Sequence, residues 1–340
     1  MMLRALNSVY FVCPSRHFSL ILQFQTFSLY MINRVLIRTK VVQNLYSYML
    51  TKPERTLAMA LKDLDSCLDK TYELYHYLLR LPVELTHIQD MRIDEARNKY
   101  LPTEEERNPN MKFVNNRLVA ALAADEQLNQ YANEHTVTWN DDPIFERIML
   151  DKVLKSDLYN DYMSDDEDSM AGDSLLWQQL MKQVILPDEN MADAIEQRSL
   201  YWTEDDMDLV GQFVCKTFRR LADGDKDAIM PMFKDDEDSD FGKDLFSATV
   251  TQMPENNIII DDLVQESRWD KDRIVLMDRI IMCAALAEMR TFDKIPVAVT
   301  LNEYIELAKN FSTAASGKFV NGILNNAVKQ LRKDGEIFKA

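Results

Sequence analysis

The stretch "IPVAVTLNEYIELAKNFSTAASGKFVNGIL", residues 295–324, decides the fold of this chain. Thr300 and Glu303 have the spacing of a capping box, which predicts a helix that starts near residue 300. A short polar loop separates this helix from a second one, whose start carries Lys318 and Phe319 side by side. The pattern therefore predicts two consecutive helices, with a cation and an aromatic ring where the second begins.

The composition favours helices in the rest of the chain as well. The 340 residues are 46% hydrophobic, which is enough for a sizeable core or for two domains. They include only 7 Gly and 10 Pro, few for the tight turns of a β-sandwich or barrel. Apolar residues recur at helical spacing in residues 33–50 and 57–78, and Pro82 follows the second pattern. We predict an all-α fold.

The charge is unevenly distributed along the sequence. The formal net charge is −17, but residues 1–53 contain no acid and carry +6, which leaves −23 for the remainder. An acidic body with a basic leading segment indicates a locally basic binding site and an affinity for basic partners. Solubility alone explains the acidic body equally well.

Two nearly identical acidic runs stand out, "SDDEDS" at 164–169 and "KDDEDS" at 234–239. A calcium-binding EF-hand loop needs oxygen ligands at alternating positions, a glycine at the sixth and a glutamate at the twelfth. Neither run has this arrangement, so we expect solvated loops. The runs also suggest the edges of an inserted segment.

These changes in composition and charge along the sequence divide the chain into four parts. Residues 1–30 are apolar but interrupted by polar residues, and no run reaches the length of a membrane span. We expect them to be a mis-extended start or a disordered leader. Residues 31–100 should form an N-terminal helical part with a basic first helix. Residues 101–240 should form an acidic, mainly helical insertion, and residues 241–340 a C-terminal helical domain.

Nothing in the sequence indicates catalysis. It has no nucleophile elbow, no P-loop and no dinucleotide-binding glycine motif. Its cysteines and histidines do not cluster, which predicts neither a metal site nor disulfides and fits a reducing cytoplasm. We expect a protein that binds a partner, without enzymatic activity, cofactor or metal.

Two helix starts are candidates for binding RNA. Arg34, Arg38 and Lys40 supply cations near one start, where backbone N–H groups also favour phosphate. Lys318 and Phe319 supply a cation and a stacking surface at the other. Proteins bind single-stranded RNA through aromatic stacking and phosphate contacts. The alternative is that Phe319 belongs to the edge of the core and that the arginines are ordinary surface charges.

The opening stretch closely resembles the C-terminal motif of the NusB family of transcription antitermination factors. That family shows I-P-x-x-V-x-I-N-E-x-x-E-L-A-K-x-F, a short loop, and then K-F-V-N-G-V-L. The matching residues are Ile295, Pro296, Val299, Asn302, Glu303, Glu306, Leu307, Ala308, Lys309, Phe311, Lys318, Phe319, Val320, Asn321, Gly322 and Leu324. Residues 38–49, "RTKVVQNLYSYM", resemble the family's basic first helix, with Tyr46 in a matching place. "DRIIMCAALAEM" is similar to the family's helix ending in Y-E-L, with Asp278 and Glu288 as its acids.

The chain also departs from the family pattern. Val35 and Leu36 stand where the family often has arginine, and Cys283 occupies a position usually held by arginine. Ala315 replaces an acid often found four places before the phenylalanine. Residues 101–240 have no counterpart in the compact family members.

The resemblance implies a two-part helical fold without enzymatic activity, in a cytoplasmic protein that is not in the membrane. Family members pair with NusE, the small-subunit ribosomal protein, and bind the boxA element of ribosomal RNA within an antitermination complex on RNA polymerase. By resemblance, Asp278 and Glu288 would contact the protein partner. The residues expected to bind RNA are Arg34, Arg38, Lys40, Tyr46, Lys318 and Phe319.

Two other functions stay open. One is a helical protein–protein scaffold that binds no RNA, in which the acidic insertion makes the contacts. The other is the helical domain of an RNA methyltransferase, which requires a nucleotide-binding domain with a glycine-rich loop that this sequence does not contain.

Overall fold

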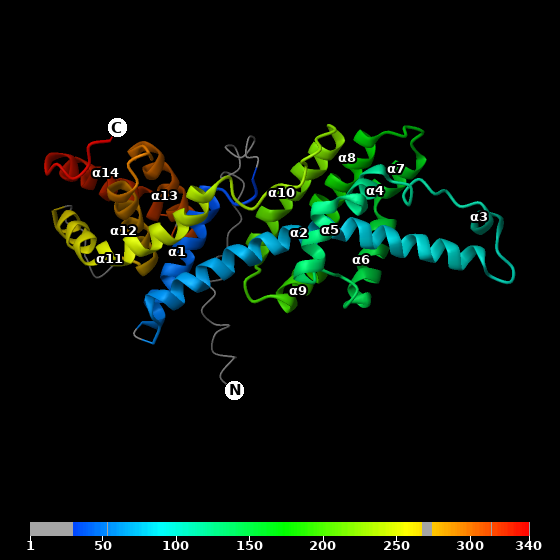
Figure 1. Ribbon diagram of the computed structural model, residues 1–340, viewed down its shortest axis with the longest axis horizontal. Helices are drawn as coiled ribbons and strands as arrows, with labels where there is room; N and C mark the ends of the chain where they lie inside the picture. The colour runs from blue at the N-terminus through cyan, green and yellow to red at the C-terminus, as the bar shows by residue number, and fades with distance from the viewer. Residues whose placement is uncertain (1–29, 53, 267–273, 314, 340) are drawn as a thin grey trace. The chain divides into compact units, whose positions relative to one another are not determined.

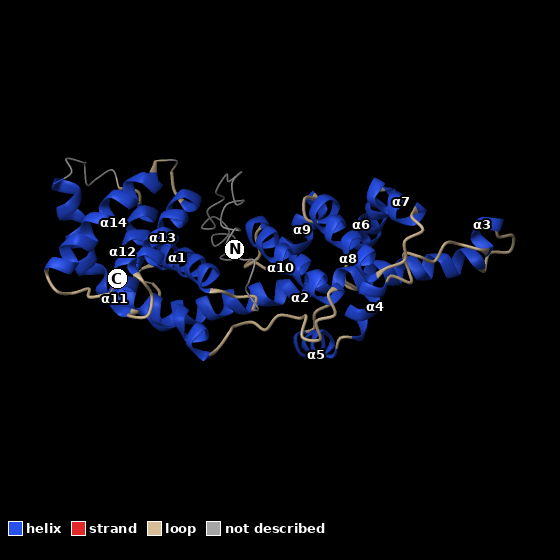
Figure 2. Cartoon of the chain, turned by 90° about the horizontal axis from the view of Figure 1, so that it is seen from above, coloured by secondary structure: helices blue, strands red, loops and turns tan. Residues whose placement is uncertain are grey.

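The computed structural model describes residues 30–52, 54–266, 274–313 and 315–339. In these ranges every regular element is a helix, as Figures 1 and 2 show, so the predicted all-α fold is confirmed. None of the helices there has the length and apolarity needed to cross a membrane. The expected leader or mis-extended start at residues 1–30 lies outside the described residues, apart from Tyr30.

The chain divides into two compact units. Unit 1 comprises residues 1–68 and 232–340, and unit 2 comprises residues 69–231. The helices of unit 1 are α1 (Arg34–Thr51), the first part of α2 (Leu57–Arg97), α11 (Asp236–Glu266), α12 (Leu276–Thr291), α13 (Val297–Phe311) and α14 (Ser316–Lys333). Unit 2 holds the rest of α2, α3 (Glu104–Arg107), α4 (Arg117–Ala124), α5 (Glu126–His135), α6 (Pro143–Lys155), α7 (Asp157–Ser164), α8 (Met170–Leu180), the π-helix η3 (Met181–Ile185), α9 (Glu189–Arg198) and α10 (Glu204–Ala222).

Helix α12 lies at the centre of unit 1. Every residue from Ile280 to Met289 is buried, because α11, α13, α14 and α1 all pack against it. A helix that is apolar on all sides is typical of such a position. Gly242 of α11 allows α1 to come close, since a Cβ added there would lie 3.0 Å from a side-chain carbon of Ile37. Unit 1 is thus a bundle arranged around α12.

Unit 2 has a separate core around α8, which packs against α4, α7 and α10. Trp177 of α8 and Phe218 of α10 are fully buried, and Phe213 of α10 is 2% exposed. A buried hydrogen bond of 2.6 Å joins the hydroxyl oxygens of Tyr75 and Thr217, which links α2 to α10.

The contacts divide the chain at 68/69 and 231/232, whereas the sequence suggested boundaries at 100/101 and 240/241. Residues 69–100 therefore pack in unit 2, and residues 232–240 in unit 1. Unit 2 contains 17 Lys and Arg against 34 Asp and Glu, a formal charge of −17. Unit 1 contains 22 of each and sums to zero. Unit 2 thus accounts for the whole net charge of the protein.

Three sequence predictions about element boundaries were wrong. Helix α2 does not end before Pro82 but continues to Arg97. Helix α13 starts at Val297, with Pro296 as its N-cap, so Thr300 lies in the helix and forms no capping box with Glu303. The second acidic run is not only a loop, because α11 begins at Asp236 and the run supplies its acidic first turn.

Candidate nucleic-acid interface

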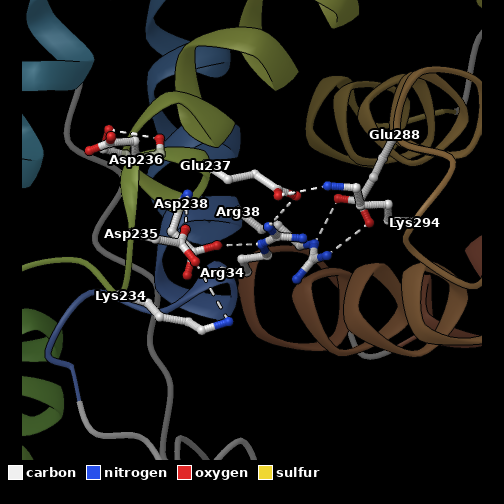
Figure 3. Close-up of polar contacts among 10 residues, drawn as sticks. Arg34, Arg38, Lys234, Asp235, Asp236, Glu237, Asp238, Glu288 and Lys294 are labelled. Atoms are coloured by element: carbon white, nitrogen blue, oxygen red, sulfur yellow. Dashed lines mark hydrogen bonds and ion pairs between the residues drawn. The ribbon is translucent and has the colours of Figure 1, made fainter.

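Arg34, in the first turn of α1, is already held by acids. Its Nε donates to an Asp238 carboxylate oxygen at 2.6 Å and its Nη2 to Glu237 at 3.1 Å, as Figure 3 shows. The guanidinium carbon lies 5.0 Å from the centre of the Phe241 ring. Hydrogen bonds from Lys294 and Arg34 lower the pKa of the Glu237 carboxyl. Since its side chain keeps 28% exposure, Arg34 is reachable from solvent but partly neutralised by α11.

Arg38 lies deeper, in a buried pair with Glu288 of α12 (Figure 3). The guanidinium donates twice, from Nε at 2.7 Å and from Nη2 at 2.9 Å. The same carboxylate accepts hydrogen bonds from the Thr300 hydroxyl at 2.8 Å and the Tyr304 hydroxyl at 3.1 Å. Burial opposes the charge on Arg38, but the charge and hydrogen bonds of Glu288 outweigh it and raise the pKa of the guanidinium. This arrangement joins α1, α12 and α13.

The expected phosphate contacts on α1 are therefore not all accessible. Arg38 and Lys40 have relative exposures of only 3% and 2%, and Tyr46 is half-buried. Helices α11 and α12 both pack on α1, and residues 36–42 are buried without interruption. The sequence pattern predicted only the stripe of apolar residues, not this complete burial of the first turns.

The start of α14 is more open. Lys318 is exposed and Phe319 is half-buried, while Val320 is fully buried in the core. The Ser316 hydroxyl donates to a carboxylate oxygen of Asp278 at 2.8 Å, which holds the helix start against α12. Lys318 and Phe319 thus begin a helix whose orientation is fixed by a buried hydrogen bond.

Asp278 and Glu288, the two acids expected to contact a protein partner, both point into unit 1. They are 4% and 0% exposed. Burial raises the pKa of the Asp278 carboxyl, and hydrogen bonds from Ser312 and Ser316 oppose this shift. Ten residues of helix separate the two acids, or about 15 Å. One therefore positions the start of α14 and the other positions α1 and α13.

Sequence reasoning missed the hydroxyl groups that complete these contacts, Thr300, Tyr304 and Ser316. Thr300 had been assigned to a helix cap, and its role in binding Glu288 depends on α13 starting three residues earlier. No local pattern pointed to Tyr304 or Ser316, because their partners lie 16 and 38 residues away in the sequence.

A hollow of about 470 Å³ lies beside Arg34. Phe241 and Phe292 line its apolar part. Its other charged residues are acids: Glu237, Asp240 and Asp244. The surplus of negative charge around Arg34 makes this hollow a poor site for phosphate.

Comparison with known proteins places these helices in a family. The family model described as "NusB family" matches residues 212–329, which includes all of α11, α12 and α13 and most of α14. The transcription antitermination protein NusB of Salinibacter ruber is 34% identical over 110 residues, covering 32% of this chain and 68% of that protein. The chain belongs to the NusB family.

Other relatives in the NusB family match over shorter stretches. NusB of Chloroherpeton thalassium is 34% identical over 100 residues, covering 29% of this chain and 47% of its own length. NusB of Bacillus thuringiensis is 36% identical over 85 residues, covering 24% of this chain and 65% of its own length. No solved structure gave a significant match. The chain thus spans less than two thirds of the length of these two relatives.

Proposed function

We propose that this chain is a transcription antitermination factor that pairs with NusE and binds boxA RNA of ribosomal RNA transcripts. Membership in the NusB family supports the role, since the relatives carry the name transcription antitermination protein. The partner and the RNA element come from the resemblance of residues 295–324 to the family motif. The complex would act on RNA polymerase.

The observation that carries the proposal is the pair Lys318 and Phe319 at the start of α14. An exposed cation beside a half-buried ring offers a phosphate contact and a stacking surface at the same place. Arg34 and Tyr46 on α1 are the other accessible members of the set. In this proposal a single strand contacts these residues as well as Lys318 and Phe319, and a second protein completes the binding surface.

The buried members of the set take a different role in this proposal. Arg38 and Lys40 support α1 from within, and they affect RNA binding through the position of that helix. Asp278 and Glu288 likewise act on NusE binding through the helices that they hold.

The substitution Phe319→Ala tests the RNA site. If a base stacks on the ring, the affinity for boxA RNA in the presence of NusE should fall by about 1–3 kcal/mol. Because Phe319 is only half-buried, the melting temperature should change little. The matched control is Phe311→Ala on α13, a ring with 7% exposure, which should cost about 3–5 kcal/mol of folding stability.

Two measurements separate the outcomes, RNA titration by fluorescence anisotropy and thermal unfolding by circular dichroism. A large melting shift in Phe319→Ala with unaltered RNA affinity would place the ring in the core and remove it from the RNA site. It would favour the alternative of a helical scaffold that binds no RNA.

A further inference from the structure

The exposed face of α14 continues well beyond Lys318 and has an unusual composition. At a spacing of about 3.6 residues per turn, one side of the helix is formed by residues that are all exposed. These are Lys318, Asn321, Gly322, Asn325, Lys329, Arg332 and Lys333, and we call them the α14 strip. Helix α14 contains no acidic residue at all, in a protein whose acids outnumber its bases by 17.

The cations of the α14 strip are largely available. In the described part of the chain, Lys318, Lys329 and Lys333 form no ion pair, and Arg332 donates only to the backbone oxygen of Lys339 at 3.2 Å. By contrast, Arg34 and Arg38 of α1 are both paired with acids. The strip therefore presents cations whose charge is not neutralised within the protein.

Gly322 provides an independent observation. A glycine inside a helix lowers its stability relative to alanine. Close packing against another helix often explains such a glycine. Close packing does not explain Gly322, because a Cβ added there would meet nothing within 4 Å among the residues that the structure describes. The glycine leaves bare backbone at the middle of the strip, where a ligand can approach closely.

The α14 strip is also long enough to contact several consecutive nucleotides of one strand. Fifteen residues separate Lys318 from Lys333, which is about 22 Å of helix. A stacked strand carries one phosphate per about 3.4 Å, so the strip matches about six nucleotides. Asn325 Nδ2 donates to the backbone and side-chain oxygens of Asn321. The amide nitrogen of Asn321 and the amide oxygen of Asn325 can still bond base edges or sugar hydroxyls. A groove of about 880 Å³ beside its second half is lined by Lys329, Lys333 and further amides, although Asp262 and Asp334 also border it.

We propose that the α14 strip binds the single-stranded RNA that flanks the boxA element, as an extension of the site at Lys318 and Phe319. This rests on the proposed function. The RNA backbone passes over Gly322, and Lys329 and Lys333 contact phosphates. The contacts carry little sequence information, so they add affinity and fix the path of the strand.

The test compares two RNAs in the presence of NusE, the boxA element alone and the same RNA extended by about six nucleotides on each side. The wild-type chain should bind the extended RNA more tightly. The double variant Lys329→Gln, Lys333→Gln should lose this gain, about ten-fold at 0.15 M salt for two phosphate contacts, and keep its affinity for the short RNA. Its salt slope on the extended RNA should flatten by about 1.4.

A matched control and a second variant complete the test. Lys243→Gln removes a cation of α11 that pairs with Asp65, and it should leave both affinities unchanged. Gly322→Ala should raise the melting temperature and weaken binding of the extended RNA, opposite effects that a purely structural glycine would not produce. If Gly322→Ala binds the extended RNA as tightly as the wild type does, the RNA backbone does not pass close to Gly322.

Other results would overturn the proposal in distinguishable ways. If the double variant binds the extended RNA like the wild type, the strip does not bind RNA, while the proposed function stands. If the double variant no longer binds NusE, the α14 strip is a protein interface. If the wild type with NusE binds neither RNA, the proposed function fails and the strip fails with it.

Discussion

At the scale of single residues, Arg38 shows how position in the fold changes the role of a charge. Arg34 and Arg38 are one helical turn apart and look alike in the sequence. The Arg34 side chain is 28% exposed and bonds to the exposed Glu237 and the buried Asp238. The Arg38 side chain is 4% exposed and makes two hydrogen bonds to Glu288. Of these two arginines, only Arg34 can contact a ligand directly.

We predict that Arg38→Gln costs about 3–5 kcal/mol of folding stability, because it leaves the Glu288 carboxylate buried without its counter-charge. The control Arg92→Gln breaks an exposed pair with Asp151 and should cost about 0–1 kcal/mol. Urea denaturation of both variants measures the two costs. Equal, small losses would show that the buried pair does not hold α1 to α12.

At the scale of elements, the acidic first turn of α11 lies against the basic first turn of α1. Glu237 pairs with both Arg34 and Lys294, and Asp238 pairs with Arg34 (Figure 3). If Arg34 contacts RNA phosphates, these carboxylates compete with the RNA for it. The run at residues 234–239 then limits the affinity of the site.

The double variant Glu237→Gln, Asp238→Asn should therefore bind boxA RNA more tightly in the presence of NusE. Removing two negative charges should strengthen binding several-fold and make its salt dependence steeper, since one more cation is free to contact phosphate. The acidic run of unit 2 offers a matched control, Asp166→Asn, Glu167→Gln, which changes the net charge equally. If both variants bind alike, the effect is one of net charge and not of the contact with Arg34.

The sequence was informative about these elements wherever the signal is local. The helical spacing of apolar residues in 33–50 predicted α1, and the helix–loop–helix pattern of residues 295–324 predicted α13 and α14. It could not show that α11 and α12 both pack on α1 or that Lys40 is buried, because these features depend on contacts between distant segments. It also placed the start of α13 at Thr300 because a capping pattern was present, but Pro296 caps the helix one turn earlier.

At the scale of the whole molecule, the two units differ sharply in charge. Unit 2 carries −17 and unit 1 carries none. All the residues proposed to bind RNA, and those that position them, lie in unit 1. We therefore propose that unit 2 is not needed for the NusE contact, and that it lowers non-specific binding to nucleic acid by repulsion.

Replacing residues 69–231 with a short Gly/Ser linker tests this division. NusE affinity should stay close to that of the full chain, and non-specific RNA should bind more tightly because 17 net negative charges are lost. Calorimetric titration and circular dichroism are the measurements. Loss of NusE binding in a chain that remains helical would assign unit 2 to the interface.

The central claim is that this chain and NusE together bind boxA RNA. The most direct measurement is a titration of fluorescently labelled boxA RNA at physiological salt with the full chain alone, with NusE alone and with both. The account predicts weak binding by the chain alone, because of its net charge of −17, and much tighter binding by the pair. It also predicts that a scrambled RNA of the same composition binds less tightly to the pair. Equal affinity of the pair for boxA and scrambled RNA, or no gain from adding NusE, would contradict it.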